Sequence, residues 1–201
     1  FVDGVPVGTT TVGSDGSWTL TGLTGLDGGE TVTATAGTGA AESALSNAVV
    51  VAYPPPAVDG PIVEGATSIT GTSTAPPGST VTVTVDGVEY TTTVQPDGTW
   101  TVTVPPVSGG DPVTATVTVG GQESGPSAQL VVDYMAPVVT GPIAAGATGV
   151  GGTSASPEGT TITVFVDGVP VGTTTVQADG SWTLTGVSGL DGGETVTATA
   201  G

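Results

Sequence analysis

The sequence has 201 residues, of which 18 are acidic and none is Lys, Arg or His, so its formal net charge at pH 7 is −18. An uncompensated negative charge of this size excludes nucleic-acid binding, because proteins that bind phosphate backbones present Lys and Arg. The absence of His, Lys and Cys also removes the usual general bases and zinc ligands, so hard cations with oxygen ligands remain as the natural charged partners.

The remaining composition leaves two interpretations open, disorder and β structure. A chain with 35 Gly and 16 Pro and a strong acidic excess is compatible with disorder. Against this stand the regular alternation of Val and Thr and a positive mean hydropathy of +0.30, which favour folded strands. No apolar run approaches the roughly 20 residues that a membrane-spanning helix needs, so we expect no membrane insertion.

The opening residues recur near the end of the chain. Residues 1–37 and 165–201 are identical at all but four positions. Trp18, Trp100 and Trp182 lie at equal spacings of 82 residues, and VDGV and DGTW motifs mark a diverged copy around Trp100. The period is therefore 82 residues, and the closer likeness of the two outer copies favours an alternating unit of about 164 residues.

This period predicts three repeats. We expect a partial repeat over residues 1–53 that lacks its N-terminal strands, a complete repeat over residues 54–134, and a partial repeat over residues 135–201 that lacks its C-terminal strand. Phe1 corresponds to Phe165, which stands inside a predicted strand, so we expect the chain to be part of a longer array.

The complete repeat predicts six or seven short strands separated by turns. Val81, Val83 and Val85 alternate with Thr, as expected of a strand with one buried face. Asp86 and Gly87 then favour a two-residue type I′ turn. Further strands are expected over residues 68–73, 88–94, 99–104, 112–119 and 127–132. The pattern predicts an all-β fold of tandem immunoglobulin-like β-sandwich domains of about 82 residues, joined by short Pro-containing linkers.

The aromatic residues are few and have two predicted places. Trp18, Trp100 and Trp182, one per repeat, are expected to fill the cores, with carbohydrate stacking by an exposed Trp as the alternative. Tyr53 and Tyr134 stand in the same register at the two linkers, and we expect them to pack at the domain junctions.

The motifs GPI followed by GAT, then VDGV, then DGSW or DGTW, recur in this order at the fixed period. This order resembles the bacterial immunoglobulin-like repeats of large surface adhesins and biofilm-associated proteins. The resemblance implies a secreted cell-surface protein with a stalk of many domains, and Ca²⁺ near junctions through an Asp of the linker. Asp133 stands in such a linker, but its equivalent at the first junction is Ala52, and Asp59 is replaced by Thr140 at the second.

Other carboxylates are weighed as Ca²⁺ ligands against ordinary turn chemistry, for which Asp is also favoured. These carboxylates lie in the DG turn before the second Trp and on either side of two Gly pairs. Ca²⁺ is the one cofactor that we consider. The full set of candidate ligands is Asp133, Asp59, Asp97, Asp27, Glu30, Asp191 and Glu194.

Three functions are compatible with these observations. The first is a structural stalk or matrix fibre of a secreted bacterial surface adhesin, located outside the cell, whose partners are neighbouring repeats and other copies of the same protein. The second is a subunit of an extracellular filament in which strands pair or complement between chains. The third is a spacer array of a secreted glycan-degrading enzyme. In all three the segment itself is not an enzyme.

Overall fold

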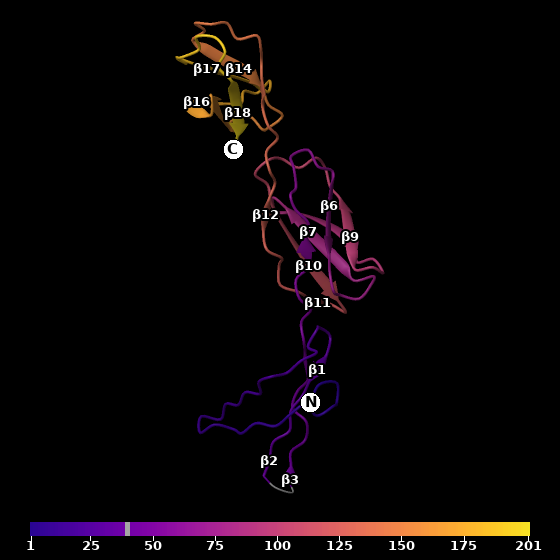
Figure 1. Ribbon diagram of the computed structural model, residues 1–201. Helices are drawn as coiled ribbons and strands as arrows, with labels where there is room; N and C mark the ends of the chain where they lie inside the picture. Colours follow the sequence, from indigo (N-terminus) through magenta and orange to yellow (C-terminus); the bar gives the residue numbers. More distant parts are fainter. Residues whose placement is uncertain (39–40) are drawn as a thin grey trace.

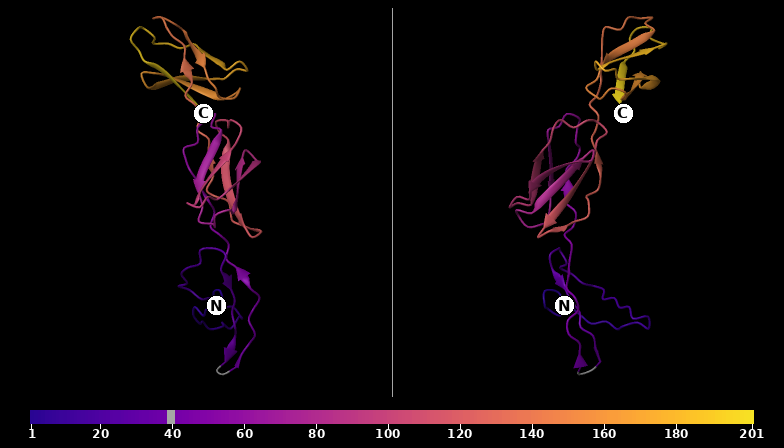
Figure 2. Two further views of the ribbon diagram at one scale, coloured as in Figure 1. Left: turned by 90° about the vertical axis from the view of Figure 1, so that its right-hand side faces the viewer. Right: turned by 180° about the vertical axis from the view of Figure 1, so that it is seen from behind.

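The computed structural model describes residues 1–38 and 41–201, and these residues form strands, turns and loops without a helix (Figure 1). Three groups of strands follow one another along the chain, and two further views show them strung end to end (Figure 2). We refer to residues 1–53, 54–134 and 135–201 as the first, second and third units. Each sheet stays within one of these ranges, and the predicted all-β class is confirmed.

The second unit is a sandwich of two antiparallel sheets. One sheet has the strand order β5 (Ala57–Val58), β6 (Ser68–Thr72), β9 (Thr99–Thr103). The other has the order β11 (Gln122–Glu123), β10 (Pro112–Val119), β7 (Thr80–Val85), β8 (Val88–Thr93), with β12 (Leu130–Val131) paired to β10. Trp100 and the inward Val side chains of β7 and β10 form a single core cluster between the sheets.

Local sequence explains the central hairpin of this sandwich. Val81 and Val83 are fully buried on one face of β7, as the alternation predicts. At the turn, Asp86 has φ 45° and Gly87 has φ 78°, the two positive values that a type I′ turn requires. The register Val85↔Val88 follows directly from this two-residue loop.

The last strand of the second unit is shorter than predicted. Strand β12 covers only Leu130–Val131, whereas the sequence indicates residues 127–132. Upstream of it the side chains of two serines replace backbone partners. Ser127 Oγ accepts from Ala115 N at 3.0 Å, and Ser124 Oγ accepts from Val117 N at 3.0 Å. The hydroxyls thus take the place of backbone acceptors for β10, while Ser124 N and Ser127 N still donate to Val117 O at 2.9 Å and Ala115 O at 2.8 Å.

The third unit repeats this sandwich. One sheet has the strand order β13 (Val138–Val139), β14 (Gly149–Thr153), β17 (Ser181–Thr185). The other has the order β16 (Val169–Thr175), β15 (Thr161–Val166), β18 (Val196–Ala200). Trp182 is 1% exposed and packs with Ile162 and Val164 in a second core cluster.

The first unit differs from the other two. It has the pairs β1 (Thr31–Val32) with β4 (Val49–Val50) and β2 (Gly37–Thr38) with β3 (Ala41–Glu42). None of its described side chains is buried.

The predicted core position of Trp18 is therefore wrong in this chain, where its side chain is 51% exposed. In the other units a glycine of the neighbouring strand lies over the indole: Gly71 pairs with Trp100, and Gly152 pairs with Trp182. No strand equivalent to β6 or β14 is present among the described residues of the first unit, so no such glycine covers the indole.

Candidate functional site: the junctions between units

The first junction is organised around Tyr53. Its ring lies on a Gly pair of the first unit, since a Cβ atom built on Gly28 would be 2.6 Å from Tyr53 Cδ1. The same ring also packs against the core cluster of the second unit. Gly29 N donates to Val51 O at 2.8 Å, which holds the strand leading into the linker beside this Gly pair. The tyrosine thus contacts both units.

At the second junction, Tyr134 lies on the equivalent Gly pair of the second unit. A Cβ atom on Gly110 would lie 2.6 Å from Tyr134 Oη, and one on Gly109 would overlap the ring. Gly110 N donates to Val132 O at 2.8 Å, and Val132 N donates to Asp111 O at 2.9 Å. At both junctions only glycine leaves room for the tyrosine ring, so the ring and the Gly pair pack directly against each other.

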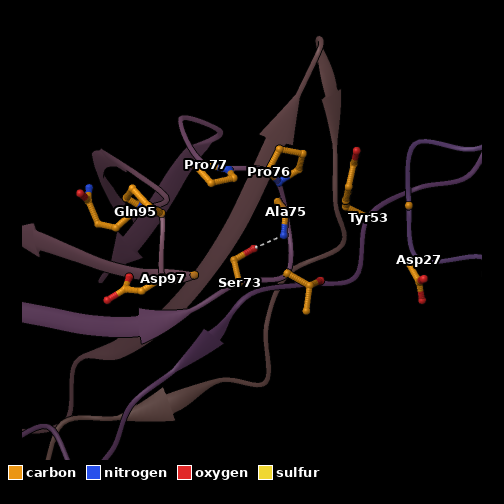
Figure 3. A pocket seen from close by; sticks show the side chains of 12 residues that line it. Asp27, Tyr53, Ser73, Ala75, Pro76, Pro77, Gln95 and Asp97 are labelled. Carbon is orange, nitrogen blue, oxygen red and sulfur yellow. Dashed lines mark hydrogen bonds between the residues drawn. The ribbon is translucent and has the colours of Figure 1, made fainter.

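A hollow of about 490 Å³ opens beside Tyr53 between the first two units. Asp27, Gly28 and Tyr53 line it from the first unit, and residues 73–77 and 95–98 line it from the second. Figure 3 shows Asp27 and Asp97 on opposite sides of the hollow, with Tyr53 between them. The two carboxylates do not converge, and residues of both units line the hollow.

The candidate cation ligand Asp97 is used by its own turn. Its Oδ1 accepts from Thr99 Oγ1 at 2.7 Å and from Thr99 N at 3.0 Å. These two hydrogen bonds, the side-chain one first, lower the pKa of Asp97 below its ordinary value. Asp179 has the same bonds with Ser181 and a lowered pKa of the same cause.

The carboxylates around the Gly pairs are used in a similar way. Glu30 accepts from Asp27 N at 3.1 Å and from Gly28 N at 2.8 Å. Glu194 accepts from Gly192 N at 2.8 Å. The pKa of Glu30 is lowered, first by its own backbone N–H, and that of Glu194 is lowered first by the Gly192 N–H. Each glutamate holds a tight loop in shape.

The two junction aspartates do not meet either. Asp59 Oδ2 accepts from Thr70 Oγ1 at 2.8 Å. Asp133 acts through its backbone, since its N donates to Ile62 O at 2.8 Å and its O accepts from Glu64 N at 2.8 Å. In residues 1–38 and 41–201 no three His, Cys, Asp or Glu side chains gather in a way that would hold a metal ion. No three of the predicted Ca²⁺ ligands, Asp191 included, therefore meet in one site among these residues.

This arrangement predicts no specific effect of calcium. We expect the melting midpoint in millimolar CaCl₂ to equal the midpoint in MgCl₂ at the same ionic strength, because both ions only screen the net charge of −18. Differential scanning calorimetry of the chain, treated first with EDTA, checks this. A higher midpoint in calcium alone would contradict it.

A second prediction concerns the turn of Asp97. The variant Thr99→Val removes the hydroxyl donor, so the pKa of Asp97 should rise toward its ordinary value, while that of Asp179 serves as an internal control and stays low. A carboxyl whose folded pKa lies below the unfolded one stabilises the fold above the unfolded pKa, and this contribution disappears as the pH falls through the folded pKa. NMR titration of the side-chain carboxyls measures both groups, and an unmoved Asp97 would refute the assignment.

Together the sandwich units and their repeated Tyr–Gly junctions define the chain as a tandem array of immunoglobulin-like β-sandwich domains. The described residues contain no helix long and apolar enough to cross a bilayer. No family model and no curated protein matches the sequence.

Solved structures similar to the chain include proteins of the class that the sequence motifs resemble. The BSP domain structure of a biofilm associated protein is 22% identical, with a TM-score of 0.33, and the match covers 73% of this chain and 26% of that one. A Ca²⁺-stabilized adhesin of an Antarctic bacterium that binds ice is 20% identical, with a TM-score of 0.26 and coverage of 85% and 55%. A two-domain fibronectin type III segment of chicken tenascin is 10% identical, with a TM-score of 0.39 and coverage of 74% and 98%. The chain spans less than two thirds of the first two structures.

Proposed function

We propose that this chain is a segment of a structural stalk or matrix fibre outside a bacterial cell, and that its function lies in holding sandwich domains in a row. One observation carries the proposal: at each of the two junctions a tyrosine lies on a Gly pair of the preceding unit. At the first junction the same ring packs against the core of the following unit. A ring held in this way restricts rotation between units.

The linkers and the charge support the same function. Only six residues, three of them proline, separate β4 from β5, and six separate β12 from β13. Proline fixes φ and lacks an N–H, so the first linker is a semi-rigid spacer. Because every ionised side chain is negative, neighbouring chains repel one another and stay soluble.

The proposal is tested by loosening the first linker. Pro54 and Pro55 are exposed, and their joint replacement by Gly should shorten the mean extent of the chain and broaden its distribution in small-angle X-ray scattering. The matched control replaces Pro105 and Pro106, which are exposed within the second unit, and should leave the scattering curve unchanged. If the linker variant scatters like the parent chain, the linker does not set the shape.

A further inference from the structure

A single buried carboxylate joins the second and third units. Glu64 is 8% exposed, and its Oε2 accepts two hydrogen bonds that cross the junction. Met135 N, in the linker, donates at 3.0 Å, and Ser156 Oγ, in the third unit, donates at 2.9 Å. Ser156 is itself 4% exposed. One oxygen atom thus holds a loop of the second unit, the linker and a loop of the third unit together.

The hydrogen bonds from these two donors replace the hydration that the Glu64 carboxylate loses on burial. Burial of a charge is costly unless the charge is paired or hydrogen-bonded, and the chain has no Lys, Arg or His to pair with Glu64. Hydrogen bonds to an ionised acceptor are short and strongly directional. If the two units rotate apart, the bond from Ser156 is lost, so the contact favours one orientation of the third unit relative to the second.

Each of these two repeats carries one partner of this contact and Ala at the position of the other. In the third unit Ala145 stands where the second unit has Glu64, three residues after the Pro of the GPI motif in each case. In the second unit Ala75 stands where the third unit has Ser156, directly before a proline in each case. Ala75 lies at the first junction, where it lines the open hollow beside Tyr53. The position facing the preceding unit is therefore a hydroxyl at one junction and a methyl group at the other.

We propose that the junctions of the array are of two alternating kinds: one pinned by a buried Glu–Ser hydrogen bond, and one in which Ala replaces the Ser, so that this hydrogen bond is absent. The inference rests on the proposed stalk function and adds where the stalk bends, which is at every second junction. It also gives a physical meaning to the doubled period of about 164 residues, because a pinned and an unpinned junction together make one repeat of the structure.

Distances between spin labels on either side of the second junction test this proposal. The chain has no Cys, so the variants Thr91→Cys and Thr173→Cys, both at exposed positions, place the labels in the second and third units without other reactive thiols. Double electron–electron resonance should give a narrow distance distribution for the labelled parent chain. With Ser156→Ala added, the ratio of pinned to unpinned molecules should fall by a factor of about ten or more, the size expected for the loss of a hydrogen bond to a charged group.

Two further variants exclude simpler causes of broadening. Glu64→Ala combined with Ser156→Ala reproduces the residues Ala145 and Ala75, and it should broaden the distribution no more than Glu64→Ala alone, because the two partners act as one contact. The matched control Ser124→Ala removes a buried hydroxyl that bonds only within the second unit, and it should leave the distribution narrow.

The outcomes separate this inference from the proposed function. A narrow distribution in the parent and in all variants overturns the pinned junction and leaves a stiff stalk. A broad distribution in the parent overturns both. Broadening in Ser124→Ala equal to that in Ser156→Ala shows general destabilisation and also overturns the pinned junction.

Discussion

Replacing Trp100 by Ala is expected to destabilise the second unit by about 3–5 kcal/mol, the usual cost of deleting a fully buried aromatic side chain. The indole is 0% exposed and lies between the two sheets. A domain of this size has a total stability of roughly 4–12 kcal/mol, so the loss removes much of it. Hydrogen exchange read by mass spectrometry measures the effect unit by unit, and protection of β6 and β9 should fall most.

The chain supplies a matched control for this prediction. Trp18→Ala removes the same side chain from the same motif, but Trp18 is 51% exposed, so the change in stability should be small. An equal cost for the two substitutions would contradict the description of the first unit.

Gly71→Val is expected to have an effect of similar size for the opposite reason. A Cβ atom at Gly71 would overlap the carbonyl oxygen of Ala57 and the indole ring of Trp100. Neither can move cheaply, because one is backbone and the other fills the core, so overpacking should cost about 3 kcal/mol or more. The control Thr72→Val adds the same side chain on the exposed face of the same strand and should be nearly neutral. Urea denaturation of both variants checks the difference, and a tolerated Gly71→Val would refute the close approach of strand and indole.

The strands of the second unit could be predicted because their signals are local. Alternation of Val and Thr defines β7, and the Asp86–Gly87 pair defines the hairpin and its register. The metal ligands could not be predicted in the same way, because Asp favours a turn and a cation site alike. The hydroxyl residue two positions after each of Asp97 and Asp179 was the signal that the carboxylate serves its own turn.

The two outer copies show what local sequence leaves open. Residues 165–201 form β15 from Phe165 onward, together with β16, β17 and β18, whereas the nearly identical residues 1–37 form only β1 and the start of β2. The difference is nonlocal: Trp182 packs under Gly152 of a strand that lies earlier in the chain, and Trp18 has no such partner among the described residues. A strand here depends on its neighbours in the sheet more than on its own residues.

The contact at the second junction lies outside local prediction for the same reason. Glu64 and Ser156 are 92 positions apart, and neither stands in a motif that indicates a binding site. Aligning the repeats does single them out, since both positions change to Ala in the neighbouring copy. Only the fold shows that the two loops meet.

The central claim is that contacts at the junctions, and not charge repulsion, keep the units in a row. Small-angle X-ray scattering of the chain at low salt and in about 1 M NaCl tests it most directly, because the Debye length falls to about 3 Å at 1 M and removes repulsion between units. We predict the same maximum dimension in both solutions. A chain that becomes markedly shorter at high salt would contradict the account, because its extension would then come from the net charge of −18 alone.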